Sequence, residues 1–187
     1  KKILEINDVT KVFKAGKSKT IANQHISFNV RRGHNLGIIG ANGAGKSTLM
    51  EQVAQIEKLD AGKISYNFAF DKSPKEKIGI QRQDLSEPFG ITCKDLIQYF
   101  IKAYHSVWEK DDFDQMLTAF GIKDFYLYNC SGLSGGQQQR LNLFLSILNN
   151  PELLILDELS TGLYIKILTN IKKLLKKLAN DYGVTLI

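Results

Sequence analysis

The glycine-rich segment 40–47 is the part of the sequence whose residue types and spacing most clearly indicate chemistry. It reads Gly-Ala-Asn-Gly-Ala-Gly-Lys-Ser, which fits the pattern G-x-x-x-x-G-K-[ST]. It follows the apolar run 36–39, which predicts a short buried strand, and it precedes apolar residues at helical spacing over 46–56. In such a strand, loop and helix, backbone N–H groups surround a phosphate, the lysine faces its outer oxygens and the serine binds Mg²⁺. The sequence therefore predicts a nucleoside triphosphate site at Gly40, Asn42, Gly43, Ala44, Gly45, Lys46, Ser47 and Thr48.

Two adjacent carboxylates, Asp157 and Glu158, follow the apolar run 153–156. They stand at the C-terminal end of a predicted buried strand, which is the edge of an α/β sheet where ligands bind. Asp157 can hold Mg²⁺ through water, and Glu158 can polarise the water that attacks a phosphate. The alternative interpretation is an acidic pair that is simply solvated. Beside a phosphate loop, we interpret Asp157 as metal-binding and Glu158 as catalytic.

The remaining apolar patterns predict the elements that must position these groups. Alternation with a period of two predicts antiparallel strands at 3–9 and 26–30, joined by the polar segment 14–19. Further strands and helices alternate along the rest of the chain: strands at 63–67, 78–81, 153–156 and 184–187, and helical periodicity at 46–56, 92–120, 134–148 and 167–178. This order predicts an α/β class with a largely parallel sheet, an N-terminal antiparallel β part and a helical subdomain. Taken with the phosphate-loop motif, the predicted core resembles a P-loop NTPase core.

Composition excludes several classes of protein. With 187 residues, 43% hydrophobic and 24% charged, the chain is expected to form a globular domain and not a disordered one. Cys93 and Cys130 are isolated, which favours reduced thiols over a disulfide framework or a zinc site. No apolar run approaches the about 18 residues that span a bilayer, so work at a membrane would need a partner. The absence of an initial Met and the strand-like pattern at the last residues suggest a fragment.

The net charge of +6 favours anionic partners such as nucleotides. The excess is spread over scattered lysines and the segment 172–177, where a solvated helix face is the more common interpretation. We therefore expect no nucleic-acid partner.

The segment 133–137, Leu133-Ser134-Gly135-Gly136-Gln137, resembles the signature sequence of the ATP-binding cassette (ABC) family when it is taken with the two motifs above. A Ser-Gly-Gly turn that opens a helix is also a second anion-binding N-terminus on physical grounds. The alternative is a serine that only caps a structural helix. The resemblance implies that the signature of one chain closes on the γ-phosphate held by another, in a homodimer or heterodimer of ATP-binding subunits.

The resemblance covers nearly the whole chain and implies further roles. Gln83 stands where the family has its Q-loop glutamine, a catalytic and metal-binding residue, and Phe13 resembles the aromatic that stacks on adenine. One ABC ATPase domain over 1–187 would comprise a nucleotide-binding core at 1–83 and 133–187 and a helical subdomain at 84–132. The family further implies ATP and Mg²⁺ as cofactors, ATP hydrolysis that energises transport, permease subunits in the membrane, and a place on its cytoplasmic face.

Two departures from the family pattern keep another function open. Tyr164 stands where the D-loop usually has an aspartate, and the family's switch histidine would fall beyond Ile187. The alternative is an ATP-gated regulatory or structural module with weak or no hydrolysis. The single-cassette layout and the run 89–96 favour an export-type system.

Overall fold

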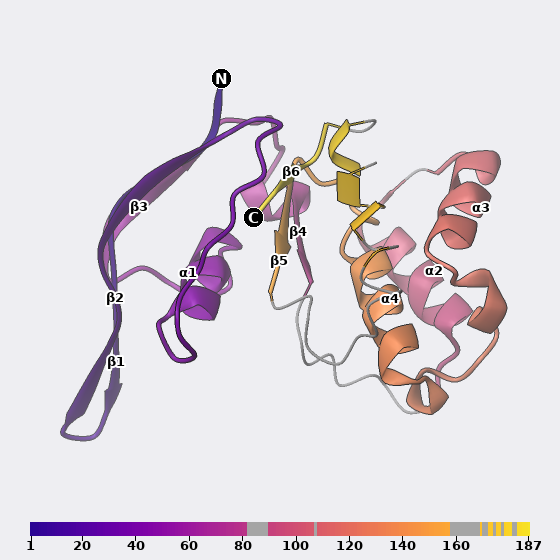
Figure 1. Cartoon of the computed structure of the whole chain (residues 1–187), viewed down its shortest axis with the longest axis horizontal. Helices are drawn as coiled ribbons and strands as arrows, with labels where there is room; N and C mark the ends of the chain where they lie inside the picture. Colours follow the sequence, from indigo (N-terminus) through magenta and orange to yellow (C-terminus); the bar gives the residue numbers. More distant parts are fainter. Residues whose placement is uncertain are drawn as a thin grey trace.

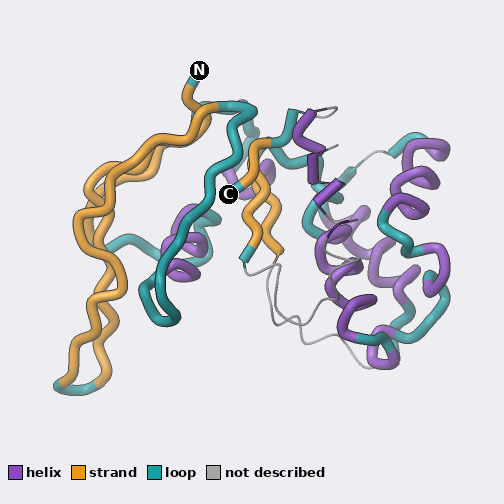
Figure 2. Tube along the Cα trace, viewed as in Figure 1, coloured by secondary structure: helices purple, strands orange, loops and turns teal. Residues whose placement is uncertain are grey.

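The structure is a computed structural model of the 187-residue chain, with two three-stranded sheets and helices arranged around them (Figures 1 and 2). It describes residues 1–81, 90–106, 108–157 and 183–187, together with residues 169, 172, 173, 175, 176 and 178–180 of the last helical segment. Gln83, Glu158 and Tyr164 therefore lie outside the described residues.

The first sheet is antiparallel and has the strand order β2-β1-β3, formed by β1 (Lys2–Ala15), β2 (Ser18–Arg31) and β3 (Ala61–Tyr66). The predicted antiparallel N-terminal part is thus confirmed, but its strands are longer than the apolar alternation indicated. Backbone pairing continues past the last core residues, since Phe13 pairs with Thr20 and Ala15 with Ser18. Only the turn at Gly16, with a positive φ of 60°, separates the two strands.

The second sheet is parallel and has the order β4-β5-β6, with β4 (Ile78–Gln81), β5 (Leu153–Leu156) and β6 (Thr185–Leu186). Consecutive side chains of a strand point to opposite faces of its sheet. Accordingly, Leu153 and Ile155 pack into one apolar cluster, whereas Leu154 packs into the other. The parallel sheet therefore separates two hydrophobic cores.

Helices cover the two faces of the parallel sheet differently. The helix α1 (Lys46–Val53) lies between the antiparallel sheet and the parallel strands, where Leu49 and Met50 join the core that contains Ile155. The other face is covered by α2 (Cys93–Ala103), α3 (Lys110–Ala119) and α4 (Gly135–Leu145), which share one apolar cluster. Three short 3-10 helices complete the described elements: η1 (Pro74–Lys77), η2 (Lys123–Phe125) and η3 (Cys130–Gly132).

The structure corrects one strand and the ends of two helices. Residues 36–39 form no strand: the N–H of Leu36 donates to the carbonyl of Leu186 at 2.9 Å, but Ile39 is 98% exposed. The physical reason is that β6 comprises only two residues and pairs no further along this segment. The helix α1 ends at Val53, before Gln55 with its positive φ of 57°. Similarly, α4 ends at Leu145 and not at residue 148.

Among the described residues, no helix combines the length and apolar character that crossing a bilayer requires.

Candidate nucleotide site

The glycines of the phosphate loop have conformations that other residues rarely adopt. Gly43 and Gly45 have φ values of 78° and 84°, in the left-handed region. A Cβ at Gly45 would lie 2.0 Å from the carbonyl oxygen of Ala22, because β2 passes directly beside the loop. The side chain of Asn23 also donates to the carbonyl of Gly45 at 3.1 Å. These contacts hold the end of the loop, and with it the start of α1, against β2.

The N-terminus of α1 is open to a ligand. Gly45 is the N-cap residue, no side chain caps the helix, and no acidic residue lies in its first turn. Ser47 is exposed and Thr48 is half-buried, while Leu49 and Met50 behind them are buried in the core. The partial positive charge of the helix N-terminus is therefore exposed on a rigidly packed element, which suits an anion.

The side chain of Lys46 folds back over the loop that precedes it. Its Nζ donates to the carbonyl oxygens of Gly40 and Ala41 at 2.9 and 3.0 Å. Since an ammonium has three donors, one remains for a phosphate oxygen, and the carbonyls can be exchanged for others. The predicted residues Gly40, Asn42, Gly43 and Ala44 form the exposed part of this loop.

Asp157 follows β5 at the end where β4 also ends. Its N–H donates to the carbonyl of Gln81 at 3.4 Å, and the register pairs Gln81 with Leu156. The strand ends and the phosphate loop point toward the same end of the molecule (Figure 1). The predicted partners Gln83 and Glu158 follow these two strand ends in the chain, but both lie outside the described residues.

Phe13 lies on the distal part of the β1–β2 hairpin and is 42% exposed, as a stacking surface must be. The ammonium of Lys11 lies 5.1 Å from its ring centroid. Lys11 in turn donates to Glu57 Oε1 at 2.6 Å and to the carbonyl of Lys58 at 3.0 Å. The Lys11 hydrogen bond lowers the pKa of the Glu57 carboxyl. Sequence reasoning missed Lys11; the signal was a lysine two residues after the buried Val9, on the same strand face.

The signature segment lies apart from the phosphate loop, at the start of α4 on the other side of the parallel strands (Figure 1). Ser134 forms a capping box, in which Gln137 N–H donates to Ser134 Oγ at 3.4 Å and Ser134 N–H donates to Gln137 Oε1 at 2.8 Å. Leu133 is buried, whereas Gly135 is exposed and would have open space around an added Cβ. The serine is therefore a helix cap in the single chain, and its neighbour leaves the helix N-terminus accessible.

Arg140, which sequence reasoning did not single out, positions this segment. Its guanidinium donates to the carbonyls of Gly121 and Gly136 at 3.1 and 3.3 Å and lies 5.1 Å from the centroid of Phe125. These contacts tie the start of α4 to the loop after α3. No local pattern indicates them, because Gly121 is 19 residues away in the chain.

Comparison with known proteins identifies the family. The profile described as ABC transporter matches residues 23–161, which include the phosphate loop, the signature segment and Asp157. The chain belongs to the ABC transporter family. Its fold, a P-loop NTPase cassette, agrees with the predicted class.

Curated ABC relatives match almost the entire chain. It is 32% identical to the methionine import ATP-binding protein MetN 3 of Oceanobacillus iheyensis, over 99% of this chain and 57% of that protein. It is 31% identical to the zinc uptake system ATP-binding protein ZurA of Listeria monocytogenes, over 100% of this chain and 76% of that protein. The chain thus spans little more than half the length of the methionine import protein.

Solved ABC structures have the same fold. A dimeric ATP-binding cassette in a post-hydrolysis state, bound to ADP and Pi, is 25% identical with a TM-score of 0.84, covering 98% of this chain and 86% of that one. The protein cbiO1 from Clostridium perfringens, part of the ABC transporter complex cbiONQ, is 29% identical with a TM-score of 0.75. That match covers 100% of this chain and 77% of the other.

Proposed function

We propose that this protein is the ATP-binding and ATP-hydrolysing subunit of an ABC transporter. The observation that carries the proposal is the phosphate loop at the uncapped start of α1, where Gly45 is held against β2 and Lys46 lies over the loop. Membership in the ABC family, which binds ATP, supports the same ligand.

The residues around the loop would have different roles in phosphoryl transfer. The N–H groups of the loop and the ammonium of Lys46 would hold the β- and γ-phosphates. Phe13 would stack on adenine, with Lys11 and Glu57 holding its strand in place. Glu158, next to Asp157 in the chain, would orient and polarise the attacking water, and Gln83 would contribute to catalysis and to holding Mg²⁺.

The donor set fits Mg²⁺. Within the described ranges, no group of three or more His, Cys, Asp or Glu could hold a metal by itself. Mg²⁺ is usually held by one or two protein oxygens together with substrate phosphates, and Ser47 and Asp157 offer such oxygens. When bound, it would neutralise charge on the phosphates.

We further propose that two such subunits close on ATP, each offering Ser134 and Gly135 to the nucleotide of the other. The separation of phosphate loop and signature within one chain supports this arrangement, as does the dimeric state of a similar cassette. Permease subunits in the membrane would be the partners, with this chain on the cytoplasmic face. Because the curated relatives named above serve import or uptake, we propose import in place of the export-type system that the layout suggested.

Equilibrium binding of a fluorescent ATP analogue tests the nucleotide site. Lys46→Ala removes a charge-assisted contact to the phosphates that is worth roughly 1.5–3 kcal/mol, so affinity should fall about tenfold or more. The matched control is Lys102→Ala, which removes an exposed lysine of α2 and should bind the analogue like the parent. Unchanged binding by Lys46→Ala would reject the proposed site.

An ATP-gated regulatory module with weak or no hydrolysis is the second candidate, favoured by Tyr164 at the position of the D-loop aspartate. Steady-state phosphate release from the purified protein separates the two functions. Sustained release in Mg·ATP would exclude the regulatory module, whereas ATP binding without release would favour it.

A further inference from the structure

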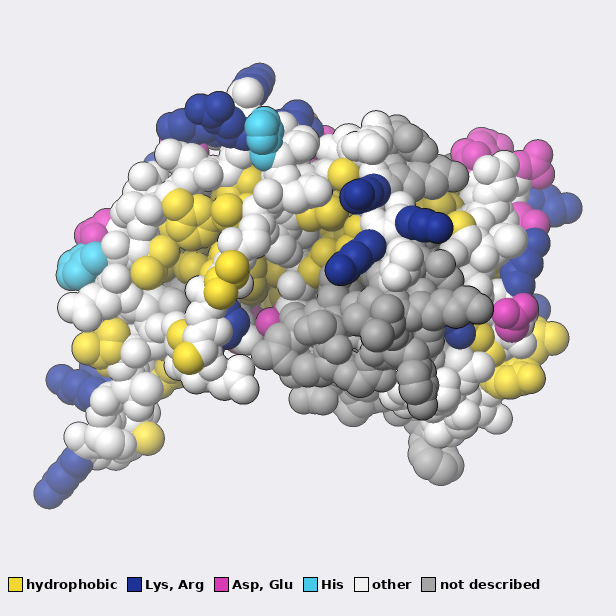
Figure 3. Space-filling model, viewed as in Figure 1, with side chains coloured by type: hydrophobic (Ala, Val, Ile, Leu, Met, Phe, Trp, Pro, Cys, Tyr) yellow, Lys and Arg dark blue, Asp and Glu magenta, His cyan; other side chains and the backbone are white. Residues whose placement is uncertain are grey.

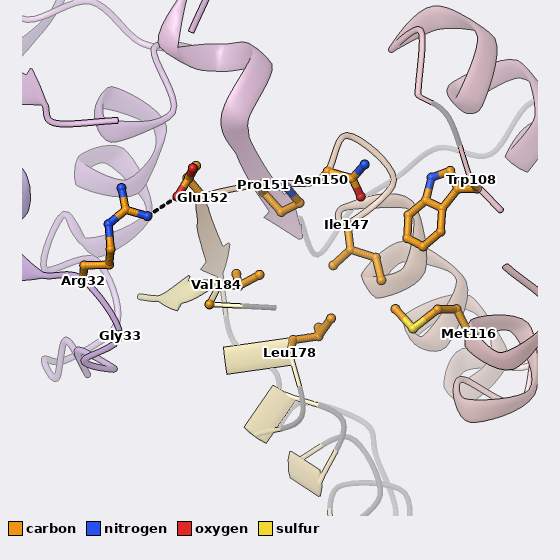
Figure 4. Close-up of a pocket in the computed structure, with 11 residues that line it drawn as sticks. Arg32, Gly33, Trp108, Met116, Ile147, Asn150, Pro151, Glu152, Leu178 and Val184 are labelled. Carbon is orange, nitrogen blue, oxygen red and sulfur yellow. Dashed lines mark hydrogen bonds and ion pairs between the residues drawn. The ribbon is translucent and has the colours of Figure 1, made fainter. Parts of the chain in front are cut away.

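A pocket of about 450 Å³ lies at the end of the parallel sheet opposite to Asp157 (Figure 4). It is formed where β5 and β6 begin and where α4 has ended, so the nucleotide residues lie at the other end of the same strands. Its volume is in the range of pockets that bind small molecules. Neither the phosphate loop nor the signature segment contributes to its walls.

Most of the pocket wall is apolar and well packed. Met116, Ile147, Leu178 and Val184 each expose 5% or less of their surface, so the wall is part of the protein core. Trp108 closes the far end, and its indole N–H donates to the carbonyl of Leu148 at 3.4 Å. Because that N–H has a partner, the indole can offer its ring to a ligand. An apolar body of several carbon atoms therefore suits this part of the pocket.

The opposite end of the pocket carries charge. Figure 4 shows Arg32 and Glu152 facing one another at this end, joined as an ion pair, with Asn150 and Pro151 along the edge. The two side chains remain 39% and 35% exposed. Among the described residues, Glu152 is the one side chain that forms an ion pair with the Arg32 guanidinium. A guanidinium has five N–H donors in a planar fork, so Arg32 can donate to a second carboxylate.

The surroundings favour an anion over a cation at this end. Two further basic residues, both exposed, are backbone neighbours of Arg32: Arg31 precedes it in the chain, and the N–H of Arg32 donates to the carbonyl of Lys1 at 3.0 Å. Lysine and arginine side chains gather over this end of the antiparallel sheet (Figure 3). A guanidinium also matches a carboxylate in geometry, since two parallel N–H groups can donate to its two oxygens.

We propose that this pocket binds a small amphipathic carboxylate, with its apolar body against Trp108 and Met116 and its carboxylate on Arg32. The site is separate from the nucleotide site and does not depend on the proposed ATPase function. The ligand carboxylate would share the Arg32 guanidinium with Glu152. The positive charge of Arg32 would therefore attract the ligand, and the negative charge of Glu152 would weaken its binding.

Trp108 makes the test direct, because it is the one tryptophan of the chain. Octanoate, octylamine and octanol, kept below micelle-forming concentrations, share an apolar chain and differ in the charge of the head group. Titration with octanoate should shift the Trp108 fluorescence emission and should saturate. The affinity for octylamine should be lower by about tenfold or more, because its ammonium group cannot accept hydrogen bonds from Arg32. Equal binding of octanoate and octanol, or a shift that does not saturate, would overturn the proposal.

Two variants isolate the role of the charges. Arg32→Gln and Glu152→Gln break the same ion pair, so any structural effect of losing that pair is common to both. Octanoate affinity should fall about tenfold or more in Arg32→Gln and should stay the same or rise in Glu152→Gln. Equal losses in both variants would contradict binding through Arg32.

Competition with ATP distinguishes this pocket from the phosphate loop. Saturating Mg·ATP should leave octanoate bound, and Lys46→Ala should bind octanoate like the parent. Displacement of octanoate by Mg·ATP in simple competition would place the anion at the phosphate loop and overturn the proposal.

Discussion

At the scale of single residues, the nucleotide site depends on two glycines that differ in what surrounds them. Gly43 and Gly45 both have positive φ, but of the two only Gly45 lies against the strand β2, where it approaches the carbonyl of Ala22. An added Cβ at Gly43 meets nothing within 4 Å. The backbone conformation and the close approach can therefore be separated by experiment.

Gly43→Ala should cost about 1–2 kcal/mol in unfolding free energy, because it only forces an alanine into the left-handed region. Gly45→Ala has the same backbone cost and must also move the loop away from β2, so its loss should be larger and ATP affinity should fall with it. Urea unfolding and binding of the fluorescent analogue measure both effects. Similar losses of stability in the two variants would contradict the close contact as a determinant of the loop.

Glu158 is the residue whose proposed role is chemical and not structural. Glu158→Gln keeps the shape of the side chain but removes the charge that polarises water, so phosphate release should fall by about 10²–10⁴ while ATP binding persists. Glu109→Gln, at the exposed start of α3, is the control for loss of a carboxylate. Phosphate release at the parental rate in Glu158→Gln would exclude Glu158 as the group that activates water.

At the scale of elements, the β1–β2 hairpin carries Phe13 and is held in place by the turn before β3. Lys11 donates to Glu57, and the N–H of Val12 donates to Asp60 Oδ2 at 2.7 Å. The position of the proposed adenine platform is thus set by residues more than 40 positions away in the chain.

Acid should weaken this attachment. Lys11 lowers the folded-state pKa of Glu57 below the ordinary value of 4.5, so the contribution to stability is complete above that value and is lost as pH falls through the folded pKa. Glu57→Gln and Lys11→Met should each lose less stability than the parent between pH 6 and pH 3, as measured by urea unfolding. An equal acid dependence in the parent and both variants would mean that the pair does not couple folding to pH.

At the scale of the whole molecule, the starts of α1 and α4 lie on opposite faces of the parallel sheet and belong to different hydrophobic cores (Figure 1). The start of α1 belongs to the core shared with the antiparallel sheet, and the start of α4 belongs to the core shared with α2 and α3. The apolar residues of α4 belong to the same cluster as those of α2 and α3, so these three helices pack as one unit. The predicted boundaries of the helical subdomain, 84–132, stay a prediction.

Sedimentation in Mg·ATP tests the proposed closure of two chains. Ser134→Arg should remain monomeric, since it places bulk and charge at the interface, while its ATP affinity stays near that of the parent. Ser134→Ala is the matched control: it loses the same helix cap, at about 1 kcal/mol, without the bulk. Equal dimerisation of Ser134→Arg and the parent would leave Ser134 as a helix cap only.

The sequence alone determined the parts of this protein whose physics is local. The phosphate-loop motif, the acidic pair and the Ser-Gly-Gly sequence at Ser134 are short runs of consecutive residues, so a local pattern was enough to predict them. The structure shows a capped helix start at Ser134, whereas the chemical roles of these residues stay predictions. The strands β4 and β5 were predicted with their observed bounds, because buried parallel strands are continuous apolar runs.

Tertiary structure decided everything that depends on partners distant in sequence. The segment 36–39 has the apolar pattern of a strand, yet Leu36 is its one residue with a backbone hydrogen bond to the described strand β6, and continued pairing defines a strand. No local pattern indicates the partners of Asn23, Lys11 and Arg32 either, which are Gly45, Glu57 and Glu152. These contacts form because the packing of the two sheets and two cores brings distant segments together. The periodicity of a single sequence indicates which face of an element is buried, but it does not indicate which element packs against that face.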